Sequence, residues 1–61
     1  MDIETKIELL LNAIKQRHPE LWLGLIISVA AKKSGWSNDD IFYLPDEKLL
    51  SGLEILNKEL S

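Results

Sequence analysis

Apolar positions in the first part of the chain recur every three or four residues. Advancing each residue by about 100° places them on one helical face, at Ile3, Ile7, Leu10, Leu11 and Ile14. Asp2 precedes the run as a candidate N-cap, and Lys15 and Arg17 follow where the helix dipole favours cations. The pattern predicts an amphipathic helix from about Ile3 to Arg17.

The next segment is apolar around most of its circumference. His18-Pro19 ends the first helix, because the residue before a proline is disfavoured in the α region, and Pro19 suits the first turn of a second helix. That helix is expected to run roughly from Pro19 to Ser34, with Gly35 as a left-handed residue just past its end. A helix apolar on so many sides must be covered on several of them, so we expect Trp22 to be buried.

Two further helical signals follow. Ser37 with Asp40 resembles a capping box and predicts a short helical turn from Asn38 to about Tyr43. The last helix is expected from Pro45 to about Leu60, with an apolar stripe at Leu49, Leu53, Leu56 and Leu60. No alternating pattern predicts a strand. We therefore expect a single all-α domain spanning residues 1–61, a three-helix bundle with one short extra turn and the second long helix in the middle.

Composition narrows the function further. The 61 residues hold no cysteine and one histidine, so disulfides and a structural metal are not expected to stabilise so small a core. Self-association or dense helix packing is the source of stability that remains. The net charge of -3 opposes binding to a phosphate backbone, so a nucleic-acid partner is not expected.

Neither a membrane span nor a secretory signal is expected. The longest apolar stretch, residues 21–31, is far shorter than the roughly 20 residues that cross a bilayer. The opening Met1-Asp2-Ile3-Glu4 lacks a basic segment. These features together predict a cytoplasmic protein.

Catalytic chemistry has little support in the residues. His18 is the one side chain that ordinarily titrates near neutrality, and its place between a helix end and a proline is explained by interaction with terminal carbonyls. No serine lies in a nucleophile motif, and neighbouring acids such as Asp39 and Asp40 diverge by about 100° on a helical turn. We predict no enzyme activity, cofactor, metal or small-molecule substrate.

A helix-turn-helix is the alternative reading of residues 30–43. Its second element would enter the major groove with Asp39, Asp40 and Phe42 but without a lysine or arginine. Lys32 and Lys33 are explained as charges at a helix end. A compact DNA-binding transcriptional regulator therefore stays the second hypothesis.

Surplus apolar surface favours a protein-interaction module. Leu9 and Ile55 each lie opposite the main apolar stripe of their helix, and two flanking helices do not enclose a helix that is apolar nearly all round. The small residues Gly24 and Ser28, and Gly52 in the last helix, allow another backbone to approach. We predict an interface with a protein partner or a second copy of the chain, as a homodimer, adaptor or inhibitor. Its candidate residues are Leu9, Trp22, Leu23, Ile27 and Ile55.

The aromatic residues around the turn leave two interpretations open. Trp36, Phe42 and Tyr43 can plug one end of the bundle or form a recognition surface, since aromatic anchors are enriched in both settings. Sequence favours the core interpretation for each.

Overall fold

A computed structural model describes residues 1–37 and 40–61. Three α-helices, α1 (Ile3–Arg17), α2 (Leu23–Lys33) and α3 (Asp46–Leu60), form a bundle, and the 3-10 turn η1 (Ile41–Tyr43) lies between α2 and α3. The described ranges contain no strand. The predicted all-α bundle with an extra turn is confirmed.

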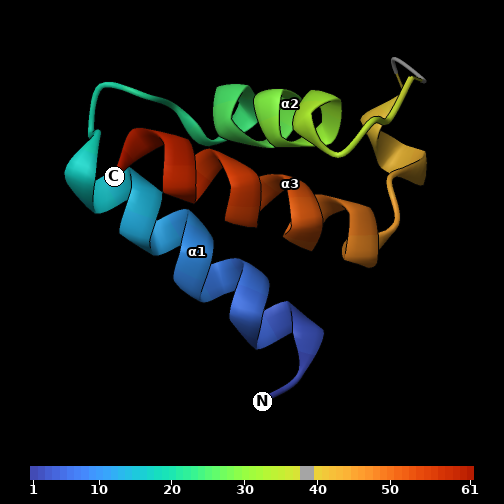
Figure 1. Cartoon of the computed structure of the whole chain (residues 1–61), viewed down its shortest axis with the longest axis horizontal. Coiled ribbons are helices and arrows are strands. Elements are labelled where there is room, and N and C mark those ends of the chain that lie inside the picture. The colour runs from blue at the N-terminus through green and yellow to red at the C-terminus, as the bar shows by residue number, and fades with distance from the viewer. Residues whose placement is uncertain (38–39) are drawn as a thin grey trace.

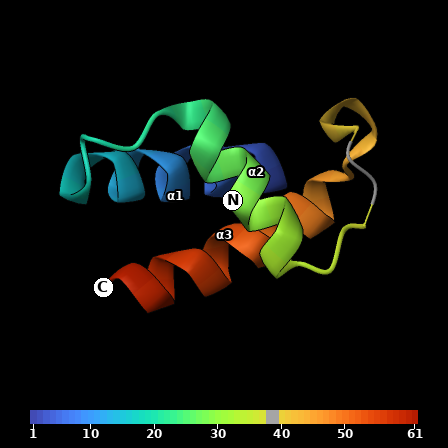
Figure 2. The same cartoon turned by 90° about the horizontal axis from the view of Figure 1, so that it is seen from above.

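The helix in the middle is α3. It packs against both other helices, whereas α1 and α2 make few contacts with each other. Figures 1 and 2 show α1 and α3 running in the same direction, with α2 crossing α3 steeply. The prediction that the second helix is central is therefore wrong. Apolar residues all round α2 did not identify the centre, because part of that helix remains exposed.

The core lies where α3 meets its two neighbours. Ile14, Ile26 and Leu53 are fully buried, one from each helix, and the apolar stripe predicted for α3 faces inward with Leu56 also buried. The backbones of α2 and α3 meet closely at Gly52. A Cβ built on Gly52 would lie 1.8 Å from the carbonyl oxygen of Ala30, so only glycine permits this crossing.

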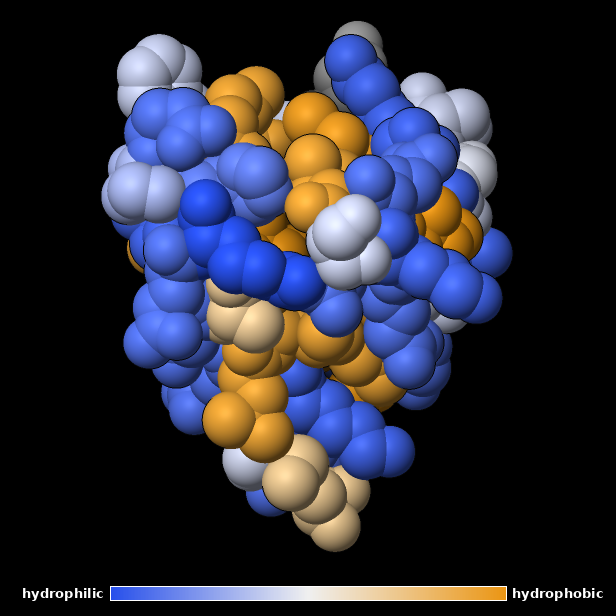
Figure 3. Space-filling view, turned by 60° about the vertical axis from the view of Figure 1, so that its left-hand side comes forward, coloured by the Kyte–Doolittle hydropathy of each residue, from blue (hydrophilic) through white to orange (hydrophobic). Residues whose placement is uncertain are grey.

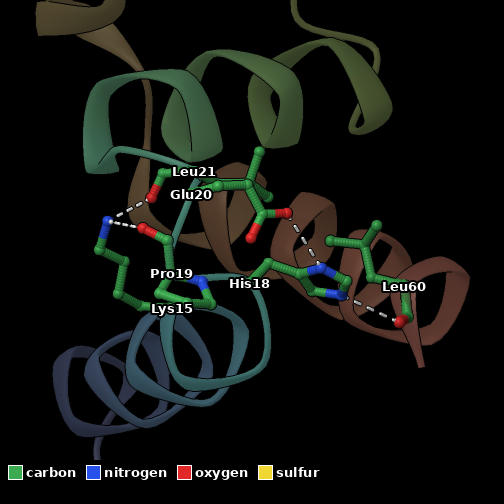
Figure 4. A network of polar contacts seen from close by, with 6 residues as sticks. All are labelled: Lys15, His18, Pro19, Glu20, Leu21 and Leu60. Atoms are coloured by element: carbon green, nitrogen blue, oxygen red, sulfur yellow. Dashed lines mark hydrogen bonds and ion pairs between the residues drawn. The ribbon is translucent and has the colours of Figure 1, made fainter.

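The start of α2 differs from the prediction. α2 begins at Leu23 rather than Pro19, because the preceding carbonyls have partners outside a helix. The ammonium group of Lys15 donates to the carbonyl oxygen of Pro19 at 3.1 Å and also to that of Leu21 (Figure 4). The backbone N–H of Leu21 donates to His18 O at 3.0 Å. A side chain of α1 thus holds residues 18–22 as a loop.

The ends of α1 and α3 follow the sequence signals. Asp2 caps α1 by accepting a hydrogen bond from Thr5 N at 2.8 Å, and hydrogen bonds from Thr5 hold the pKa of the Asp2 carboxyl below its ordinary value. Pro45 precedes α3, and Asp46 and Glu47 occupy its first turn. The predicted bounds of α1 are confirmed, and α3 ends at the predicted Leu60 but begins at Asp46, one residue after the predicted Pro45, which is its N-cap.

The turn after α2 combines a confirmed glycine with a corrected cap. Gly35 has φ +86°, in the left-handed region, as its position after the helix predicts. Asp40 is itself the N-cap of η1 and accepts from Phe42 N at 3.0 Å, so the predicted capping box beginning at Ser37 is wrong. The predicted turn residues Asn38 and Asp39 lie outside the described residues.

Candidate interaction surface

Large apolar side chains lie exposed on all the helical elements. Nine are exposed among the described residues: Met1, Leu9, Trp22, Leu23, Leu25, Ile41, Phe42, Tyr43 and Ile55. Figure 3 shows one face on which apolar atoms follow the middle of the molecule between hydrophilic atoms on either side. Single exposed apolar residues are ordinary on proteins, so only those that gather on one surface bear on an interface.

The residues proposed from sequence for an interface are accessible with one exception. Leu9 is 52% exposed, Ile55 is 42% exposed, and Leu23 is exposed at the start of α2. Ile27 is half-buried. Their outlying positions on the helices therefore correspond to solvent-facing surface in the monomer.

Trp22 is exposed, contrary to the prediction that it is buried. Its side chain is 69% exposed, because Trp22 has extended backbone as the N-cap of α2 and is not part of the helical face. The helical spacing that placed it among buried residues begins only at Leu23. Trp22 and Leu23 together form an apolar edge where the chain enters α2.

A shallow groove lies between α1 and α3. It has a volume of about 240 Å³ and is lined by Met1, Lys6, Leu9, Leu10, Leu50 and Glu54. We call it the α1–α3 groove. Its lining includes Leu9 of α1, so this predicted interface residue faces residues of α3. None of the described lining residues comes from α2. Leu9 is thus grouped with Leu50 rather than with Leu23 or Ile27.

The aromatic residues of η1 are on the surface. Phe42 is 98% exposed and Tyr43 is also exposed, so the interpretation that they plug the core is wrong for both. A single 3-10 turn is too short to bury all three of its apolar residues against one neighbour. Trp36 is half-buried, and its indole N–H is buried without a hydrogen-bond partner among the described residues.

Polar contacts join the C-terminal ends of α1 and α3. The Nε2 atom of His18 lies 3.3 Å from Leu60 O, and Nδ1 lies 3.5 Å from a carboxylate oxygen of Glu20 (Figure 4). Arg17 donates to the amide oxygen of Asn57. The imidazole of His18 therefore contacts a terminal carbonyl of α3, which fixes the two helix ends together.

The described residues form neither a metal-binding cluster nor a membrane-spanning helix. Within residues 1–37 and 40–61, no group of three or more histidine, aspartate or glutamate side chains is arranged to hold a metal ion. None of the described helices has both the length and the apolar content needed to cross a membrane.

Sequence reasoning missed the α1–α3 groove and the exposure of η1. Leu9 as an outlier was the available signal for the groove, but its other residues belong to ordinary helical faces. Which faces adjoin depends on how the helices pack. Three consecutive apolar residues, Ile41-Phe42-Tyr43, were visible in the sequence, yet their exposure follows from the short turn that they form.

Comparison of the chain with protein-family models, curated proteins and solved structures finds no match.

Proposed function

We propose that the chain is a non-enzymatic protein-interaction module that binds another protein, or a second copy of itself, through its exposed apolar side chains. Acting as an adaptor or inhibitor of a larger protein fits this proposal, as does a homodimer. The exposure of the aromatic residues supports it most directly: Phe42 is 98% exposed on η1. Aromatic side chains are enriched at protein interfaces relative to the rest of the surface.

The energetic argument concerns water around these side chains. Burying a fully exposed phenylalanine releases about 1.5–3 kcal/mol of hydrophobic free energy. Phe42 contributes little of this within the monomer, because almost all of its surface remains in solvent. That free energy becomes available when a partner covers Phe42. Tyr43 beside it adds a second ring, whose hydroxyl can stay in contact with water at the edge of the interface.

A photo-reactive phenylalanine analogue in place of Phe42 tests the proposal. Irradiated in an extract of the cells that make the protein, this variant should form a discrete adduct heavier than the 7.0 kDa chain. Added wild-type chain should compete the adduct away, whereas added Phe42→Ser chain should compete at least about tenfold more weakly, since the apolar anchor is gone. Electrophoresis followed by mass spectrometry measures both effects.

A matched control carries the same analogue at Lys48, which is exposed on α3. It should give no adduct that wild-type chain can compete away. Equal adducts from both positions would mean random collision and would contradict the proposal for η1.

The DNA-binding alternative receives no support from the described element that would read bases. η1 spans three residues, Ile41–Tyr43, none of them basic, whereas recognition helices place several base-reading side chains in the major groove. We predict no measurable binding to duplex DNA at physiological salt, because the chain has a net charge of -3. A gel-shift series checks this. Submicromolar binding that weakens steeply with added salt would replace our proposal with the regulator.

A further inference from the structure

We propose, resting on the proposed function, that the surface at η1 binds a basic segment of another protein, in which lysine or arginine side chains flank an apolar one. Three exposed apolar residues and two exposed acidic residues form this surface, which we call the η1 surface: Ile41, Phe42, Tyr43, Asp46 and Glu47. It lies at one end of the bundle, where α3 begins (Figures 1 and 2).

The negative charge of the chain is concentrated in the segment that contains η1. The chain has 10 acidic and 7 basic residues. Residues 37–47 hold four of the acidic residues, Asp39, Asp40, Asp46 and Glu47, and no lysine or arginine. The rest of the chain has six acidic and seven basic residues, so the net charge of -3 comes entirely from this segment. A partner that covers η1 therefore meets negative charge, which favours a basic surface.

Two of these carboxylates are available to a partner. Asp46 and Glu47 are exposed in the first turn of α3, and neither forms an ion pair with another described residue. Asp46 follows Phe42 by four residues, so their Cα atoms are at most about 14 Å apart. Lys48 does not neutralise Asp46, because two positions along a helix correspond to about 200° and the two side chains leave α3 on opposite sides. One short segment of a partner can therefore contact the aromatic rings and the carboxylates together.

The aromatic rings favour the same kind of partner. Phe42 is 98% exposed and Tyr43 is 72% exposed, so both rings are open to solvent. The faces of such rings are partly negative and attract a lysine ammonium or an arginine guanidinium. A shallow hollow of about 310 Å³ is lined by Ile41 and Phe42 among the described residues, and it offers an apolar side chain a place beside the rings. The surface thus suits a partner that carries both cationic and apolar groups.

A second copy of the chain fits this surface poorly. In a two-fold dimer a surface meets itself, because each contact between residue i and residue j occurs twice. Joining two η1 surfaces would bring Asp46 and Glu47 of both copies into one interface. Like charges facing each other across an interface oppose association. The favoured partner is therefore a different protein of opposite charge.

Fluorescence anisotropy with three short labelled peptides of equal length tests the inference. One peptide contains leucine and lysine, the second leucine and glutamate, and the third serine and lysine at the same spacing. The wild type should bind the leucine–lysine peptide at least about tenfold more tightly than either other peptide, since only it supplies both apolar and cationic groups. Phe42→Ser should weaken this binding about tenfold. Asp46→Asn/Glu47→Gln should weaken it about fivefold and make it less sensitive to salt.

A matched control removes two carboxylates from the opposite end of the bundle. Glu20 lies beside His18, and Glu59 is in the last turn of α3. Glu20→Gln/Glu59→Gln makes the same change in net charge and should leave binding of the leucine–lysine peptide unchanged to within about twofold. Circular dichroism confirms that each variant folds. Equal binding of the leucine–lysine and leucine–glutamate peptides overturns the inference, as does a control that weakens binding as much as Asp46→Asn/Glu47→Gln. No binding up to about 1 mM has the same consequence.

Photo-crosslinking at Phe42 separates failure of this inference from failure of the proposed function. If wild-type chain and Asp46→Asn/Glu47→Gln chain compete the adduct away equally well, the partner does not recognise the acidic charge; the inference then falls and the proposed function stands. An adduct with the mass of two chains has the same consequence, because the partner is then a second copy. If no competed adduct forms although the leucine–lysine peptide binds as expected, the proposed function fails and the charge preference of the η1 surface stands.

Discussion

Replacing Gly52 with alanine is expected to unfold most of the chain at room temperature. The added Cβ would lie 1.8 Å from Ala30 O and 2.5 Å from the carbonyl carbon, which are backbone atoms and cannot turn aside. α2 must therefore move away from α3 and withdraw Ile26 from the core. Alanine gains up to about 1 kcal/mol in helix propensity over glycine. We expect the steric cost to exceed this by at least about 3 kcal/mol, comparable to the whole stability of a domain this small.

Urea denaturation followed by circular dichroism measures the effect, and Gly24→Ala is its matched control. A Cβ at Gly24 meets only the Trp22 side chain at 4.0 Å, so this substitution keeps the propensity gain and adds no clash. It should stabilise the fold by about 0.5–1 kcal/mol. If Gly52→Ala is as stable as Gly24→Ala, the backbones of α2 and α3 do not approach each other at Gly52 as closely as described.

The local signals in the sequence predicted the helix ends that depend on neighbouring residues. Asp2 and Pro45 mark the starts of α1 and α3, and Gly35 marks the turn after α2; each acts on backbone groups within a few residues. The start of α2 could not be predicted in this way. It depends on the ammonium group of Lys15 reaching the carbonyl oxygens of Pro19 and Leu21.

The other features of the fold and the surface depend on how the helices pack against each other, which local sequence signals do not predict. α3 is central because it packs against both α1 and α2. Gly52 sets only the close crossing with α2 at Ala30, and glycine in a helix has several other causes that sequence does not separate. The same holds for the surface. Leu9 and Ile55 were identified as outliers because helical periodicity alone places them off the stripe, and both are exposed. The pairing of Leu9 with Leu50 across the groove needed the relative placement of α1 and α3.

Leu53→Ala is expected to destabilise the fold by about 2–5 kcal/mol, the usual cost of removing a buried leucine and leaving a cavity. Leu53 is fully buried at 0% exposure, and it lies on α3, so the cavity opens where all three helices meet. For a domain of this size the melting temperature should fall by about 10 °C or more.

Ile55→Ala on the same helix is the control. Ile55 is 42% exposed, so less apolar contact is lost, and alanine favours the helix. Its cost should remain below about 1 kcal/mol. Thermal melts of the two variants at equal concentration show whether Leu53 and Ile55 differ as a core residue and a surface residue should. Equal destabilisation would contradict the assignment of Ile55 to the open surface, and with it the view that α3 buries one face and leaves the other to solvent.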